Sequence, residues 1–225
     1  TAKYLSPSRN SEYSNESLLG SRVDHLSPHE FRLALQARNV VARKLIDLCV
    51  ARGLPFRHHP LGFLICTIFS HPPEHGRIHI WPGLNATTEK VVCPIHDHVF
   101  EFTSWVLAGE LENVEYHKRA TGKPFAMYRA EYTNNNSTLV RTNKTVNLEE
   151  SSRVICPTGC MYSVASGQLH ETRLVGHGPA VSVLLTIDKS SGPPIVLGPL
   201  DGACRYEYHR IEATLEEINA ACLGI

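Results

Sequence analysis

The chain has 225 residues, of which 42% are hydrophobic, and its 22 basic and 22 acidic residues cancel in charge. This length suits one domain with a sizeable core, and the balanced charge argues against nucleic acid or an anionic membrane as the main partner. No apolar run is long enough to span a bilayer, no signal-peptide profile is visible, and the seven cysteines are scattered, so we expect a reduced cytoplasmic protein without disulfides.

The first part of the chain changes from a polar stretch to a helical pattern. Residues 1–26 are rich in Ser, Asn and charge, which predicts a loose flexible extension. Ser27 then suits a helix N-cap, followed by a proline in the first turn and by Glu30, which can complete a capping box. The apolar residues that follow recur at helical period and stop at Gly53. We predict that residues 27–54 form one helix or two that pack on the main domain.

From about residue 56 the pattern indicates strands. Short stretches rich in β-branched and aromatic residues are separated by Gly, Pro or Asn clusters, among them LGFLICTIF, GRIHIW, TSWVLAG, LENVEYH, AMYRAEY and AVSVLLTI. Many short strands without helical patterns between them indicate an all-β barrel or sandwich. We place this domain at residues 55–200. Residues 201–225 are expected to form a C-terminal segment with a short helix capped by Thr214.

The segment PIHDHVFEFTSWVLAGELENVEY, residues 94–116, carries two histidines one residue apart. Residues i and i+2 of a strand point to the same side, so His96 and His98 share a face. Burying two histidines without partners is costly, whereas a divalent metal stabilises both. By the same rule, His58 and His59 point to opposite faces and are not expected to form a chelate.

A third histidine has to come from elsewhere in the chain. Downstream, a glycine turn and a strand lead to Leu169-His170, which opens another strand. A histidine that enters beside a His-x-His pair completes a facial set of three ligands, with positions open for substrate and dioxygen. Two other histidines compete with it. His177 lies in a Gly-flanked turn, and His79 alternates with two isoleucines and can face inward, so His79 stays an outside candidate.

These two histidine-bearing segments resemble a known family. IHDHVFEFTSWVLAGELENVEY resembles the first cupin motif, and YSVASGQLHETRL with the following GPAVSVLLT resembles the second. The resemblance covers roughly residues 60–190 and is strongest with the cysteine dioxygenase type of cupin. It implies a jelly-roll β-barrel with flanking helices, and a mononuclear non-heme iron(II) held by His96, His98 and His170.

The chain departs from that family at the residues that serve cysteine oxidation. The positions of the family's cysteine–tyrosine crosslink read as Thr103 and Thr186. Its Ser-x-His-x-Tyr relay retains only Ser182, because Leu184 stands in place of the histidine. Both devices are therefore expected to be absent, and cysteine itself is not the expected substrate.

Several residues are candidates for contact with the substrate. The family's carboxylate-binding arginine corresponds to Arg57 or Arg77, because an insertion before the histidine pair leaves both alignments open. Arg173 and the tyrosines, Tyr162 among them, are further candidates for a pocket group that replaces the relay. Many cupins also use a glutamate after the histidine pair. Glu101 comes one residue before that spacing, so it needs a bulge to face the metal, and a surface position is the alternative.

Together these residues predict an iron(II) oxygenase that acts with dioxygen on a small anionic substrate, such as an amino acid, a hydroxy acid or a thiol. The sequence specifies neither the substrate nor an oligomeric state. Three neutral ligands leave the iron its full double positive charge, so an anionic, chelating substrate binds directly. A non-redox isomerase or lyase with zinc, manganese or nickel would use the same ligands and is the alternative; a binding or sensory module without metal is a third.

Overall fold

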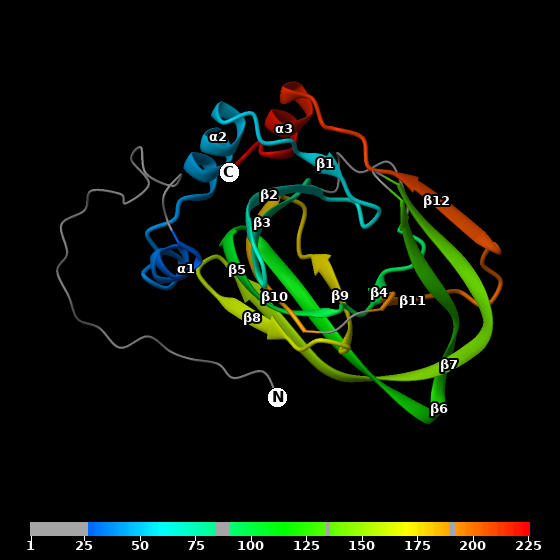
Figure 1. Cartoon of the computed structure of the whole chain (residues 1–225). Coiled ribbons are helices and arrows are strands. Elements are labelled where there is room, and N and C mark those ends of the chain that lie inside the picture. Colours follow the sequence, from blue (N-terminus) through cyan, green and yellow to red (C-terminus); the bar gives the residue numbers. More distant parts are fainter. Residues whose placement is uncertain (1–26, 84–90, 134–135, 190–191) are drawn as a thin grey trace.

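The computed structural model describes residues 27–83, 91–133, 136–189 and 192–225. The expected extension over residues 1–26 lies outside these ranges. Figure 1 shows a β-barrel with helices on one side and a long two-stranded ribbon on the other. In the described part of the chain, every helix is too short or too polar to cross a membrane.

Two helices precede the barrel, α1 (Pro28–Gln36) and α2 (Ala42–Ala51). The capping box that the sequence predicts is present at the start of α1. The Ser27 hydroxyl accepts a hydrogen bond from the N–H of Glu30, whose carboxylate accepts the N–H of Ser27. Beyond α2, Gly53 has a φ of 67°, a left-handed conformation that glycine adopts without strain and that commonly ends a helix.

The first sheet has six antiparallel strands in the order β1-β2-β3-β10-β5-β8. Their bounds are Arg57–His58 (β1), Leu64–His71 (β2), Glu74–Trp81 (β3), Ala180–Asp188 (β10), Phe100–Ala108 (β5) and Met161–Val164 (β8). The helix α3 (Leu215–Ala221) begins after Thr214, whose side chain caps it as the sequence predicts. All three described helices pack on one face of this sheet.

The second sheet has the order β11-β4-β9-β6-β7-β12. Its bounds are Ile195–Gly198 (β11), Ile95–His96 (β4), Leu169–Leu174 (β9), Glu110–Thr133 (β6), Asn136–Pro157 (β7) and Arg205–His209 (β12). The stretches LENVEYH and AMYRAEY, which the sequence predicts as separate strands, both belong to β6. An irregularity in the pairing with β7 lies between them, and the two strands form the long ribbon of Figure 1.

The order in which the strands alternate between the sheets defines the fold. Between β3 and β10 the chain contributes eight strands, which pair as β3-β10-β5-β8 in one sheet and β4-β9-β6-β7 in the other. Numbered one to eight along the chain, this is the order 1-8-3-6 facing 2-7-4-5. Two facing sheets of four strands joined in this way form a jelly roll, the fold of the cupins. The predicted fold class is confirmed.

The first sheet is buried on both faces, and this determines which side chains reach the site. Val183 of β10 and Trp105 of β5 share an apolar cluster with helix residues such as Leu45. Their neighbours Leu184 and Phe102 belong to a separate cluster inside the barrel. Side chains alternate along a strand. The barrel interior is therefore faced by the even-numbered residues of β10 and by the even-numbered residues of β5 from 100 to 106.

Candidate metal centre

Three histidines converge in the barrel interior. His96 ends β4, His98 follows two residues later, and the register of β4 and β9 places His170 directly opposite His96. The centroid of the His96 ring lies 4.6 Å from that of His98 and 4.7 Å from that of His170. The centroids of His98 and His170 are 5.2 Å apart. One ligating nitrogen from each ring lies within 4.8 Å of the others. The structure thus brings together the three residues that the sequence selects as a metal-binding set.

Hydrogen bonds determine which nitrogen of two of these rings is free. His96 Nδ1 lies 2.9 Å from the carbonyl oxygen of Pro94, and His170 Nδ1 lies 2.9 Å from Oδ1 of Asn113. Both oxygens can only accept, so each Nδ1 carries the proton and each Nε2 keeps its lone pair. The Nε2 atom of His170 is buried and has no hydrogen-bond partner among the described residues. A bound divalent cation satisfies such an atom, so these residues fit a metal ion.

A chain of hydrogen bonds supports His170 from behind. Asn113, which is 3% exposed, accepts at Oδ1 from His170 and also from the Thr172 hydroxyl at 3.4 Å. The Tyr162 hydroxyl lies 3.2 Å from that of Thr172. Burial raises the pKa of Tyr162, so its phenol stays protonated and can donate to Thr172. Tyr162, a candidate for substrate contact, is therefore placed where it supports a histidine through two intermediates.

The burial of the three rings keeps them neutral. Burial is the main cause that lowers the pKa of His96, and the Pro94 carbonyl only partly opposes it. Burial also holds the pKa of His98 and of His170 well below the usual histidine range, with further contributions from the neighbouring imidazoles. Neutral imidazole is the form that binds a metal, so the site has this form at neutral pH.

Aromatic rings form one wall of the site. Phe100 stacks on His98 with 4.5 Å between ring centroids and 18° between planes. The ring of Phe102 lies 5.5 Å from that of His98 and 5.4 Å from that of His170. The guanidinium carbon of Arg77 lies 4.9 Å from the centroid of Phe100, on the interior side of β3. This wall keeps water away from the histidines on the side of the first sheet.

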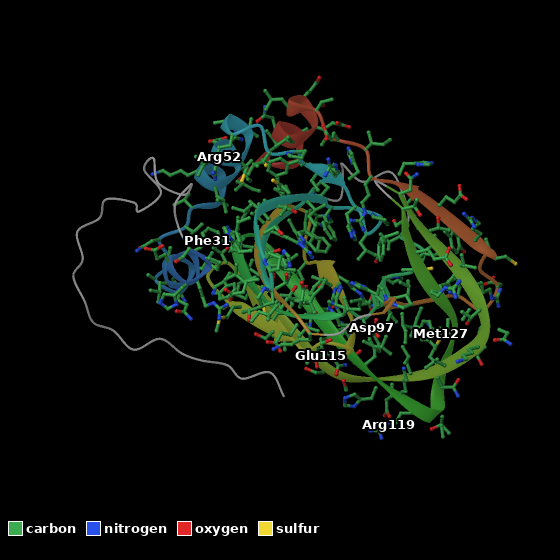
Figure 2. All side chains as sticks on the ribbon, in the orientation of Figure 1. Phe31, Arg52, Asp97, Glu115, Arg119 and Met127 are labelled. Atoms are coloured by element: carbon green, nitrogen blue, oxygen red, sulfur yellow. The ribbon has the colours of Figure 1, made fainter. Side chains whose placement is uncertain are left out.

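A cavity opens on the other side of His96 and His98. The empty space in it is about 620 Å³, a volume that includes open solvent at its mouth. Apolar side chains contribute to its lining, and so do His59, Tyr132 and Arg210. In Figure 2 the label of Asp97, the residue between the two histidines, marks this region, whereas Arg119 lies away from it, at the bend in β6 at the bottom of the view.

Two arginines that the sequence offers as substrate contacts lie elsewhere. Arg57 forms an ion pair with Glu212 at 3.0 Å. Arg173 forms an ion pair with the buried Glu171, on the side of β9 opposite to His170, because residues 170 and 173 differ by an odd number along the strand. Neither arginine lines the cavity. The structure therefore does not bring them to the histidines, whereas it brings Arg77 beside them.

The two further candidates for the metal shell also lie outside it. Glu101 has an odd number in β5 and therefore faces away from the histidines. It forms an ion pair with Lys189 at 3.1 Å, so it occupies the surface position that the sequence left open as the alternative to the metal shell. His79 is buried and faces inward, but its ring stacks on Phe63 with 4.4 Å between centroids. Burial lowers the pKa of His79 to about 3. Neither residue belongs to the metal-ligating group found in the described residues.

The correspondence drawn for the family's crosslinking pair needs a correction. Thr103 faces outward, where its hydroxyl lies 2.9 Å from that of Ser163, whereas Thr186 is buried on the interior face. Side chains on opposite faces of a sheet cannot be joined by a covalent bond. The residue of β5 paired with Thr186 is Phe102. At least one of the two positions was therefore misassigned, because a shift of one residue moves a side chain to the other face.

Sequence reasoning missed two residues of the cavity. His58 points outward to Glu217 at 3.3 Å, so His59 points inward, where it stacks on Phe63 at 4.3 Å and lines the cavity. The sequence did contain a signal for His59, because adjacent residues of a strand point to opposite faces and one of His58 and His59 therefore has to face inward. Arg210 follows β12, beyond the stretch that resembles cupins, and no local pattern marks it. Its place depends on the pairing of β12 with β7.

Comparisons with known proteins add the following. No protein-family model and no curated protein matches the chain. Among solved structures, hydroquinone 1,2-dioxygenase from Sphingomonas sp. TTNP3 is 8% identical (TM-score 0.33; 55% of this chain, 65% of that chain). Hydroxypropylphosphonic acid epoxidase from S. wedmorenis is 11% identical (0.34; 56% and 50%). An uncharacterized protein with a double-stranded β-helix domain from Klebsiella pneumoniae is 17% identical (0.31; 60% and 84%). The chain spans less than two thirds of the first two, and these weak likenesses say nothing about the reaction.

Proposed function

We propose that this protein is a mononuclear non-heme iron(II) oxygenase that acts with dioxygen on a small anionic substrate able to chelate the metal. The observation that carries the proposal is the set of three neutral imidazoles, one buried (His170) and two partly buried (His96 and His98), with no carboxylate in the metal-ligating group of the described residues. Three histidines on one side of a cation leave the remaining positions free for other ligands.

The charge of this ligand set selects the substrate. Because the three ligands are neutral, a divalent ion in this site keeps its full double positive charge. A substrate with two negative charges neutralises that charge best. An amino acid, a hydroxy acid or a thiol can supply neighbouring anionic and neutral donors. Iron(II) in such a site supplies a place where substrate and dioxygen bind together and electrons move between them.

The chain's own residues prepare the site for that role. Pro94 and Asn113 fix the protons of His96 and His170 on the nitrogens that face away from the centre. The aromatic wall excludes water on one side, and the cavity beside His98 admits a small molecule on the other. These groups bind and orient, and no acid or base among them is needed to start the reaction.

The interior of the barrel supports a substrate other than cysteine. Leu184 faces inward and packs in the apolar cluster with Phe102 and Tyr162, at the position that the resemblance gives to the relay histidine. An apolar side chain there cannot carry a proton. We therefore propose that substrate activation depends on direct coordination to the metal, and that cysteine is at best a poor substrate.

Metal content and oxygen use test the proposal. Protein purified without added metal should contain iron, and metal-free protein reloaded with iron(II) should consume oxygen with some member of a panel of small amino acids, hydroxy acids and thiols. The same protein loaded with zinc should be inactive. Turnover with zinc, or turnover without oxygen, would instead assign the protein to the non-redox isomerases or lyases.

A further inference from the structure

The cavity beside the histidines has a wall that continues across several strands of the second sheet. His96 of β4 pairs with Val196 of β11, and Val196 also pairs with Tyr128 of β6. Two residues further along β6, Ala130 pairs with Leu139 of β7. Residues that pair directly across a ladder share a face, and so do residues two apart in one strand. These positions therefore form one wall that begins at a histidine and ends on the β6–β7 ribbon.

The middle of this wall is apolar. Val196, Ala130 and Leu139 are buried, belong to one hydrophobic cluster and line the cavity. Apolar surface in a cavity is stabilised when an apolar part of a ligand covers it. His96 and His98 line the same cavity, so a molecule whose head binds at the histidines can lay its tail against this surface.

The wall is long compared with a simple amino acid. From β4 to β7 it crosses three strand spacings, about 14 Å along the sheet at roughly 4.8 Å each. One amino-acid residue spans only about 3.5 Å in an extended chain. A simple amino or hydroxy acid bound at the histidines therefore leaves most of the wall uncovered.

The far end of the wall is polar. Ser137 of β7 pairs with Tyr132 of β6 and with Tyr208 of β12, and all three residues line the cavity. Arg210 lines the same end, with its guanidinium carbon 5.6 Å from the ring centroid of Tyr132. This end of the cavity therefore differs in polarity from the apolar stretch between it and the histidines.

The hydroxyl of Ser137 indicates what the far end binds. Ser137 is 4% exposed, and its Oγ is buried without a hydrogen-bond partner among the described residues. A buried hydroxyl in this state is destabilising, and buried polar atoms in proteins nearly always have a partner. Because Ser137 lines the cavity, a ligand that fills the cavity can supply that partner.

From this wall we propose that the substrate is a metal-chelating acid with an apolar tail, and that Ser137 binds a hydroxyl, carbonyl or amide at the end of that tail. The inference rests on the proposed function in placing the chelating head at the histidines. It extends the substrate class from simple acids to acids that carry an apolar chain or ring. Ser137 acts here in recognition and takes no part in the reaction.

Alkyl hydroxamates test the tail, because their anionic head chelates a metal through two oxygens. Hydroxamic acids of two to eight carbons are titrated calorimetrically into the full chain loaded with zinc. Affinity should rise by about two- to fourfold for each added methylene over at least three consecutive members, the range for partly to fully buried methylenes. Ala130→Leu fills the middle of the wall and should remove most of this rise.

The ω-hydroxy counterparts of these acids test Ser137. For at least one chain length, the ω-hydroxy acid should bind about 2- to 10-fold more weakly to Ser137→Ala than to the unaltered chain, the range of a neutral hydrogen bond. The methyl-ended acid should bind equally to both proteins. Thr138→Val is the matched control, because it removes a neighbouring hydroxyl that faces the other side of β7, and it should change neither affinity.

Two further readouts separate this proposal from a structural role and from the proposed function. The thermal unfolding midpoint of Ser137→Ala should not fall, because the variant removes a hydroxyl without a partner, whereas loss of a structural hydrogen bond would lower it. Zinc replaces iron in these titrations, so they do not depend on oxygen chemistry. In metal-free protein, binding should be weaker but still rise with chain length. Affinity that is independent of chain length, or ω-hydroxy acids that bind Ser137→Ala as well as the unaltered chain at every length, overturns the proposal.

Discussion

Asn113 offers the sharpest test of how the metal centre is built. Its Oδ1 is the acceptor that fixes the proton of His170 on Nδ1, and both residues are buried, at 3% and 2% exposure. In Asn113→Leu the side chain keeps a similar volume but accepts no hydrogen bond. The His170 ring then has either a buried N–H without a partner or the other tautomer, whose proton sits on the nitrogen that should bind the metal.

The expected effect can be worked out in two ways. A buried donor left without an acceptor costs about 1–3 kcal/mol. Loss of the group that orients a ligating histidine typically lowers metal affinity by about 10- to 100-fold, or about 1.4–2.8 kcal/mol. The two estimates agree, so the dissociation constant for iron(II) or zinc should rise by that factor. Tyr162→Phe, which removes only the far end of the chain through Thr172, should raise it by less than about tenfold.

Competition against a chromophoric chelator measures these constants directly. The matched control is Asn147→Leu, which removes a hydrogen bond of 2.9 Å from Asn147 to the Ala120 carbonyl on the exposed β6–β7 ribbon and should leave metal affinity unchanged. Far-UV circular dichroism shows whether each variant keeps the fold. A dissociation constant within twofold of the unaltered protein in a folded Asn113→Leu variant would falsify this account of the site.

Three further expectations concern the histidines and the first helix. His170→Ala should lose most of the bound metal in elemental analysis while unfolding cooperatively in urea, and full retention of metal would show that another residue is the third ligand. His79 is neutral when folded, with a pKa of about 3 against about 6.5 when unfolded, so its contribution to stability is complete above pH 6.5 and is lost as the pH falls towards 3. Between pH 6.5 and 5 the unaltered protein should therefore lose about 2 kcal/mol more unfolding free energy than His79→Phe, and equal losses would contradict this. Ser27→Ala removes the cap of α1 and should lower the unfolding free energy by about 1 kcal/mol in urea titrations, whereas no change would mean that α1 unfolds separately from the barrel.

The features that the sequence predicts well are local or periodic. The capping box at Ser27 depends on residues three apart, and the shared face of His96 and His98 depends on residues two apart. Short alternating strands indicate an all-β fold because each pattern is complete within a few residues. The order of those strands, and the choice of His170, came from the resemblance to the cupin motifs.

The features that the sequence did not reveal depend on register and on distant pairing. Thr103 seemed equivalent to an interior position, but the alternation along β5 turns it outward and turns Phe102 inward. Arg173 is only three residues from His170, yet this odd separation places it on the other side of β9. Arg210 reaches the cavity because β12 pairs with β7. Such placements are set by tertiary hydrogen bonds between strands, which a local pattern does not contain.

The smallest strand of the barrel carries one of the three histidines, and this has a consequence for local opening. β4 has only two residues. It pairs with β9 at one residue pair, His96 with His170, and with β11 at two residue pairs. A strand held by so few ladder contacts opens at a low free energy compared with its neighbours. An ion bound by both histidines joins β4 to β9 across the one position where they meet. A metal ion bound there would therefore hold the two strands together, and the edge of the cavity would be more rigid with the site filled than with it empty.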